Sequence, residues 1–192
     1  MKTKLTLFAV FLIFLCPFFS LAMSSDEQGI LAVMECLWQN DIDKAIVLLN
    51  EGLKKNPQDV QFLKLRTQML YVQGNMQATQ RDVETLLELE PDNTGFMTYK
   101  CVLKENTGAE TAEYLSCYRQ IVEHMRKHHP EAYLEQDADY ITALLLAKLP
   151  EAEGARQRFL NSLGDSPRDE SYRIYFTNFH RNDVVIPPQA RQ

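Results

Sequence analysis

The sequence predicts an all-α fold in which antiparallel helix hairpins stack one after another. Three observations support this prediction. Pro57 and Pro91 follow similar apolar patterns and lie 34 residues apart, so a helix-ending residue recurs at a fixed interval. The segments before both prolines carry apolar residues at i, i+3, i+4 and i+7, which is the spacing of an amphipathic helix. No segment of the sequence alternates apolar and polar residues between hairpin turns, as strands do.

Residues 1–22 are predicted to be a cleavable signal peptide. Two lysines precede a short apolar run, and the small residues Ser20 and Ala22 follow it, which is the pattern of a secretory signal. Two alternatives remain open. One is a membrane anchor, for which the run is short and interrupted by Pro17, and the other is lipid modification of Cys16. A cleaved signal implies a periplasmic or secreted protein that has no membrane span after cleavage.

The predicted mature chain, from about Met23 on, is acidic and long enough for one domain with a core. It carries 18 basic and 26 acidic residues, which give a formal charge of −8. This balance, with no long basic run, argues against binding of nucleic acid or of an anionic membrane surface. The partner that we expect is a protein or peptide in the cell envelope.

The first two predicted units, residues 26–59 and 60–93, align without a gap when their prolines are superimposed. Each reads as helix, turn, helix, with the turns at 39–43 and 73–77, where Asn, Asp and Gly favour turns and helix caps. The second helices carry the clearest apolar stripes: Ala45, Ile46, Leu48, Leu49, Gly52 and Leu53 in the first unit, and Val83, Leu86, Leu87 and Leu89 in the second.

The pattern continues less regularly towards the C-terminus. Residues 94–130 are predicted to form a third unit with a turn at 105–109; the stretch from Pro91 to Pro130 that contains it is about five residues longer than the 34-residue interval. Residues 131–166 read as a fourth unit. Residues 167–192 read as a closing helix, capped by Ser166, and an extended tail that begins at Asn182. The closing helix should cover the last unit with one aromatic face: Tyr172, Tyr175, Phe176 and Phe179.

A 34-residue helix–turn–helix period is that of the tetratricopeptide repeat (TPR), and the chain resembles this family at specific positions. The matching residues are Ala45, Leu49, Gly52 and Pro57 in the first unit, and Leu70, Gly74 and Pro91 in the second. The chain departs from the family at Gly29 and Leu63, where an early Trp is usual, and at Thr79, where a smaller residue is usual.

The resemblance implies a right-handed superhelical stack, a TPR-like α-solenoid, of about four units. The first helices of the units would line a concave groove that binds a partner. The residues expected in this groove are Met34, Leu37, Trp38, Lys64, Gln68, Tyr71, Thr98 and Val102. The alternative for Trp38 and Tyr71 is packing within the stack or against the C-terminal tail, since aromatic residues at helical spacing are often core residues.

Cys101 and Cys117 are a candidate disulfide pair. They fall on the two predicted helices of the third hairpin, and Cys117 lies one helical turn from the position opposite Cys101. Two buried free thiols are the alternative, and both remain open. Cys36 is predicted to be a small core residue.

The sequence predicts no catalytic residues, no metal site and no cofactor. His124 and His128 lie at i and i+4, but two ligands do not complete a zinc shell. No GxSxG, HExxH or phosphate-binding glycine loop is present in the sequence. We therefore expect a non-catalytic protein-binding scaffold, an adaptor or assembly factor of the cell envelope. The alternatives are an immunity protein that neutralises a toxin delivered to the periplasm and, third, a metal-dependent or cell-wall hydrolase.

Overall fold

The structure is a computed structural model that describes residues 25–185 of the chain. In this range helices are joined by short turns and no residue lies in a strand, so the all-α prediction is confirmed. The predicted signal peptide, its cleavage site, Cys16 and the end of the predicted tail lie outside the described residues.

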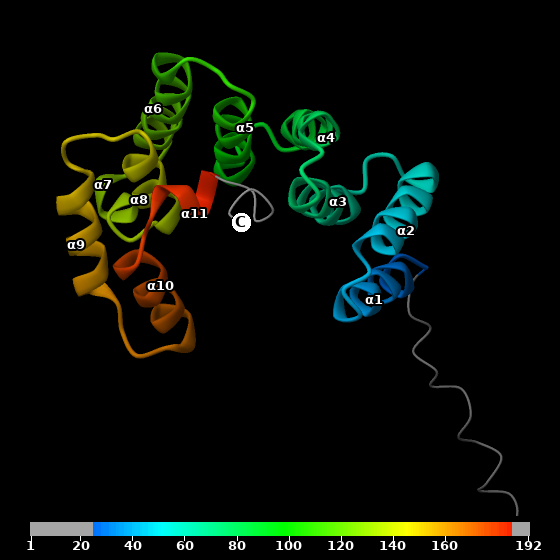
Figure 1. Cartoon of the computed structure of the whole chain (residues 1–192). Helices are drawn as coiled ribbons and strands as arrows, with labels where there is room; N and C mark the ends of the chain where they lie inside the picture. The colour runs from blue at the N-terminus through cyan, green and yellow to red at the C-terminus, as the bar shows by residue number, and fades with distance from the viewer. Residues whose placement is uncertain (1–24, 186–192) are drawn as a thin grey trace, which may run out of the picture.

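Helices α1 to α6 follow one another in a curved row, α7 to α10 gather at its end, and α11 returns to lie beside α5 (Figure 1). Helices that are neighbours in sequence pack together from α1 to α6, α8 then packs on α6, and α5 also contacts α8 and α11. The bounds are α1 (Ser25–Trp38), α2 (Ile42–Lys55), α3 (Val60–Val72), α4 (Met76–Leu89), α5 (Thr94–Asn106), α6 (Thr111–His128), α7 (Glu131–Leu134), α8 (Ala138–Leu146), α9 (Ala152–Ser162), α10 (Pro167–Thr177) and α11 (Arg181–Val185).

The turns inside the first three hairpins share a backbone conformation at an interval of 34 residues. Asn40, Gly74 and Gly108 all have a left-handed backbone, with φ of 57°, 75° and 86°. Glycine adopts this conformation without strain, and asparagine tolerates it better than most residues. The third hairpin therefore keeps the period as far as its turn. Its additional length lies in α6, which has 18 residues where α2 and α4 have 14 each.

Helix starts recur with the same period. Asp41 and Asn75 cap α2 and α4, and Asp59 and Asn93 cap α3 and α5; each side chain accepts a hydrogen bond from the backbone N–H three residues later. Helices α2 and α4 end two residues before Pro57 and Pro91, as the steric effect of proline on the preceding residue requires.

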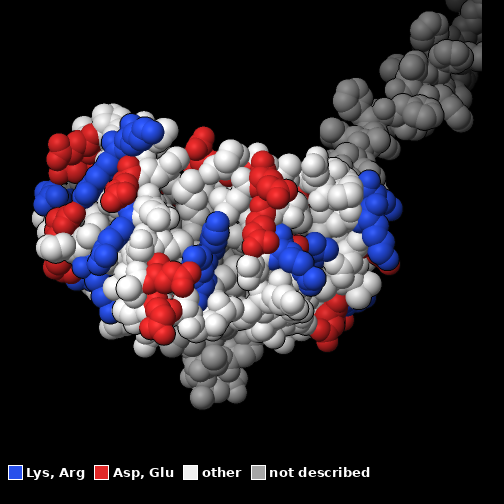
Figure 2. Space-filling view, turned by 90° about the horizontal axis from the view of Figure 1, so that it is seen from above, with Lys and Arg blue, Asp and Glu red and all other residues white. Residues whose placement is uncertain are grey.

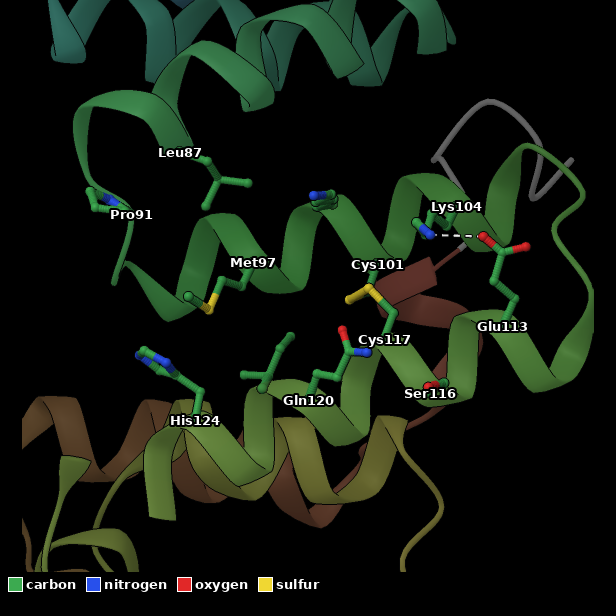
Figure 3. Close-up of a pocket in the computed structure, with 12 residues that line it drawn as sticks. Leu87, Pro91, Met97, Cys101, Lys104, Glu113, Ser116, Cys117, Gln120 and His124 are labelled. Carbon is green, nitrogen blue, oxygen red and sulfur yellow. Dashed lines mark hydrogen bonds and ion pairs between the residues drawn. A yellow bond between two sulfur atoms is a disulfide. The ribbon is translucent and has the colours of Figure 1, made fainter. Parts of the chain in front are cut away.

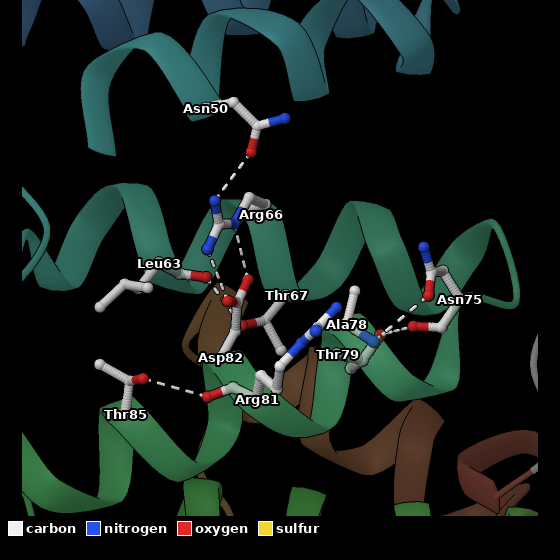
Figure 4. A network of polar contacts seen from close by, with 10 residues as sticks. All are labelled: Asn50, Leu63, Arg66, Thr67, Asn75, Ala78, Thr79, Arg81, Asp82 and Thr85. Atoms are coloured by element: carbon white, nitrogen blue, oxygen red, sulfur yellow. Dashed lines mark hydrogen bonds and ion pairs between the residues drawn. The ribbon is translucent and has the colours of Figure 1, made fainter. Parts of the chain in front are cut away.

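One buried ion pair connects three helices (Figure 4). Arg66 of α3 donates two hydrogen bonds to Asp82 of α4, at 2.8 and 2.6 Å, and a third to Asn50 of α2, at 2.7 Å. The Asp82 side chain is 7% exposed. Such a bidentate pair fixes the relative placement of the helices, because both partners lose stabilisation if they move apart.

The apolar core has two parts. The first lies among α1 to α4 and includes Leu49 and Phe62, and the second lies among α3 to α11 and includes Tyr118, Phe159 and Phe176. In the first part the ring of Phe62 packs against Gly29 and Gly52, which belong to the preceding hairpin. This explains the departure from the TPR pattern at Gly29: a large side chain there would occupy the space of Phe62.

The closing helix forms as predicted. Ser166 caps α10, Pro167 is its first residue, and the fully buried Phe176 packs edge-on against Phe159 at 4.9 Å between ring centroids. The prediction of an extended tail from Asn182 was wrong for the described part, because residues 181–185 form α11 and pack on α5. A helix of five residues is too short to show a periodic pattern in the sequence.

Candidate protein-binding surface

Large apolar side chains are exposed on one face of α1. Trp38 is 79% exposed and Leu31 is 54% exposed. Together with the half-buried Met34 they follow the spacing i, i+3, i+7, which places them along one face of the helix. We call these three residues the α1 stripe. Leu37, also predicted for the groove, is half-buried and packs against the first part of the core.

The predicted groove residues of α3 are polar and accessible. Gln68 is exposed, and Lys64 is half-buried. The Lys64 amine lies 3.8 Å from a carboxylate oxygen of Glu90 and 5.1 Å from the ring centroid of Phe96. Because the two side chains of this ion pair are 42% and 38% exposed, solvent weakens the pair and it contributes little to stability.

The groove prediction was wrong for Tyr71 and Val102, which are 8% and 4% exposed and belong to the core. The Tyr71 hydroxyl accepts a hydrogen bond from Asn106 at 3.2 Å, and its ring packs edge-on against Tyr99. Burial raises the pKa of the Tyr99 hydroxyl. Thr98 is half-buried. Val102 is buried because its helix, α5, is packed on several sides, by α4, α6, α8 and α11. Tyr71, on α3, is buried because its ring packs against Tyr99 of α5.

Cys101 and Cys117 are bonded in the structure and connect α5 to α6, with 5.6 Å between their Cα atoms. The sequence left this disulfide and two free thiols open. Cys36 is buried and free, at the core position predicted for it.

A cavity of about 610 Å³ lies beside this disulfide, between α4, α5 and α6 (Figure 3). Leu87, Met97 and Ile121 give it an apolar wall, and Lys104 at its edge forms an ion pair of 2.7 Å with Glu113. Its size is typical of a small-molecule pocket. No motif in the sequence pointed to it, because its walls come from three helices whose apolar residues also serve packing.

The face of the molecule seen from above in Figure 1 carries interspersed acidic and basic side chains with wide uncharged areas between them (Figure 2). No field of a single sign covers this face. Recognition there would therefore depend on apolar contacts and individual ion pairs rather than on long-range attraction.

His124 and His128 lie together on α6, with their rings stacked at 4.5 Å, and His124 Nε2 is 3.6 Å from Asp92. Within residues 25–185 no group of three or more His, Cys, Asp or Glu side chains is placed to hold a metal ion. The predicted absence of a metal remains a prediction.

The first-helix side of the third hairpin is covered by α11. Arg181 of α11 forms a bidentate ion pair with Glu105 of α5, and the Tyr118 hydroxyl donates a further hydrogen bond to Glu105. Burial, and then the Glu105 carboxylate, raise the pKa of the Tyr118 hydroxyl. No pattern in the sequence pointed to Glu105 or Arg181, which are 76 residues apart.

No helix among the described residues combines the length and the apolar composition needed to cross a membrane. No protein-family model matches the chain, and no curated protein matches it.

Proposed function

We propose that the protein is an exported, non-catalytic scaffold that binds another protein or a peptide, as an adaptor or assembly factor of the cell envelope. We further propose that its hairpins form a right-handed, TPR-like superhelical stack. The recurrence of turn conformation and helix caps every 34 residues supports the stack. The predicted signal peptide and the acidic composition support the location.

The observation that carries the proposal is the exposure of the α1 stripe. Trp38 leaves 79% of its surface in contact with solvent, and Leu31 leaves 54%. Exposure of neighbouring large apolar groups has a cost in solubility, and such groups mark interaction sites when they lie together. Tryptophan is also among the residues that contribute most to binding free energy at interfaces.

Affinity capture from an envelope extract tests this function. The chain from Met23 on is compared with the double variant Leu31→Ala/Trp38→Ala, whose helical content should be unchanged because both side chains are exposed. We expect the double variant to capture about tenfold less of the partner, or less still, than the unaltered chain does. The matched control is Ile174→Ala on α10, which removes an apolar side chain that is 58% exposed.

If the double variant and the unaltered chain capture the same partner in equal amounts, the α1 stripe does not bind that partner. Capture of a toxin in place of an envelope component would identify an immunity protein and replace the adaptor proposal.

A further inference from the structure

Arg181 is enclosed by groups from three other helices. Its Nε and Nη2 atoms donate to the two carboxylate oxygens of Glu105, at 3.1 and 2.6 Å, and Nη1 donates to the carbonyl of Leu146 at the end of α8. The guanidinium carbon lies 5.5 and 5.4 Å from the ring centroids of Tyr114 and Tyr118 on α6. We call Glu105, Tyr114, Tyr118 and the Leu146 carbonyl the arginine cradle.

Contacts that do not involve Arg181 hold the cradle in shape. The fully buried Tyr118 donates its hydroxyl to Glu105 at 3.2 Å. The disulfide joins α5 and α6 at Cys101, one helical turn before Glu105, and at Cys117, next to Tyr118. The spacing of the two helices at the cradle is therefore set covalently.

The chemistry of the cradle selects arginine. The Glu105 side chain is 14% exposed, and a carboxylate this enclosed is strongly destabilised without a cation. Two oxygens, a carbonyl and two aromatic rings together match a planar cation with several donors. Arginine meets all of these at once, whereas lysine offers a point charge that cannot pair bidentately or stack.

The segment that now supplies the arginine is small. Helix α11 has five residues, and besides Arg181 its half-buried Val184 packs against the core. It lies on α5 and reaches α8, which are first helices of the third and fourth predicted units. This is the side on which the sequence predicted a bound partner.

We propose that the cradle is an arginine-recognition site, and that an arginine-bearing segment of the protein partner replaces Arg181 there when the partner binds. This inference rests on the proposed function and adds the partner's recognition residue to it. The formal charge of −8 on the predicted mature chain favours a basic segment. An occupant from the same chain makes binding selective, since a partner must compete with α11 for the site.

A peptide assay tests the exchange without the partner. The probe is the labelled peptide of residues 178–185, NFHRNDVV, and the receptor is the whole mature chain carrying Arg181→Ala, which vacates the cradle. By fluorescence anisotropy we expect this receptor to bind the peptide about tenfold or more tightly than the unaltered chain does. The affinity should fall back when the receptor is the double variant Arg181→Ala/Glu105→Gln. It should also fall back when the peptide itself carries Arg181→Ala.

Equal affinity for the two peptides, or no binding by a receptor whose circular dichroism is native, would overturn the proposal. If Arg181→Ala does not fold, Arg181→Lys replaces it as receptor, because it keeps a cation but loses the bidentate pair. A concentration-dependent dimer of the unaltered chain would show that a second copy supplies the arginine, which also contradicts the proposal.

Capture from envelope extract then separates a recognition site from a purely structural contact. Arg181→Ala opens the cradle and should raise capture of the partner, whereas Glu105→Gln should lower it. If both variants capture the same amount of partner as the unaltered chain does, the proposal is overturned. If even the unaltered chain captures no partner, the proposed function fails while the peptide result still stands.

Discussion

At Gly52 the backbone of α2 approaches the ring of Phe62 more closely than any side chain would allow. A Cβ atom built on Gly52 would overlap Cε1 of Phe62 and lie 2.7 Å from Cδ1, and one built on Gly29 would lie 2.9 Å from Cζ. The ring is 4% exposed, so it is enclosed by neighbouring groups. Gly29 and Gly52 of the first hairpin thus leave the space that the ring of Phe62, in the second hairpin, fills.

We predict that Gly52→Ala lowers the free energy of unfolding by about 1–3 kcal/mol, because the added methyl group overpacks a buried ring. Thermal or urea unfolding measures it. The matched control is Gly154→Ala in α9, where a Cβ meets only Arg158 at 3.5 Å. This change should be neutral or stabilise by up to about 1 kcal/mol, the helix-propensity difference. Equal effects at the two glycines would contradict the packing of Phe62.

At the scale of the helices, pairs of elements are joined by a few polar or covalent contacts in addition to apolar packing. Arg66 connects α2, α3 and α4, the disulfide connects α5 to α6, and Arg181 connects α11 to α5 and α8. Each of these contacts depends on the relative position of its two helices. Apolar packing alone would tolerate some sliding of one helix along another, so these contacts help to fix the register.

We predict that Asp82→Ala lowers the free energy of unfolding by about 2–4 kcal/mol, since it leaves the Arg66 guanidinium without its carboxylate. Urea denaturation measures this. The comparison variant is Glu135→Ala, which breaks the ion pair with Arg158, where the two side chains are 60% and 46% exposed. That loss should stay below about 1 kcal/mol. A small effect at Asp82 would mean that solvent compensates Arg66.

The disulfide yields a prediction of its own. Cys101 and Cys117 are 16 residues apart, and a cross-link that closes a loop of about 15 residues contributes about 3 kcal/mol. We expect Cys101→Ser/Cys117→Ser to lose about this amount, as measured by urea denaturation, with Cys36→Ala as a control that leaves the cross-link in place. Mass measurement after alkylation of the unfolded, unreduced protein should show one labelled thiol among residues 25–185. Three labels there would exclude the bond.

At the scale of the whole molecule, most contacts join helices that are close in sequence, and the core divides into two parts. If the hairpins behave as a repeat array, as we propose, a local change should affect neighbouring hairpins and leave distant ones intact, because the stability of such arrays is close to a sum of unit and interface contributions. The contact of α11 with α5 spans far more of the chain, since it connects residues 76 positions apart.

We predict that Leu49→Ala, at a fully buried position of the first core part, speeds amide hydrogen exchange in α1 and α2 and leaves α9 and α10 unchanged. The reverse is expected for Leu144→Ala, whose side chain is 1% exposed in the second part. Hydrogen exchange of both variants is measured by mass spectrometry. Exchange that speeds up equally along the entire chain would show a single cooperative unit and contradict the divided core.

Local patterns in the sequence were enough to predict the helical class, the 34-residue interval, the ends of α2 and α4 and the cap of α10. Proline, glycine and capping side chains act within one turn of their own position, so the information is local. The burial of Tyr71 and Val102, the packing of Phe62 on Gly52 and the ion pair of Arg181 with Glu105 came from tertiary packing and could not be predicted. These contacts join residues far apart in the chain, and no local pattern encodes which distant side chain will fill a given space.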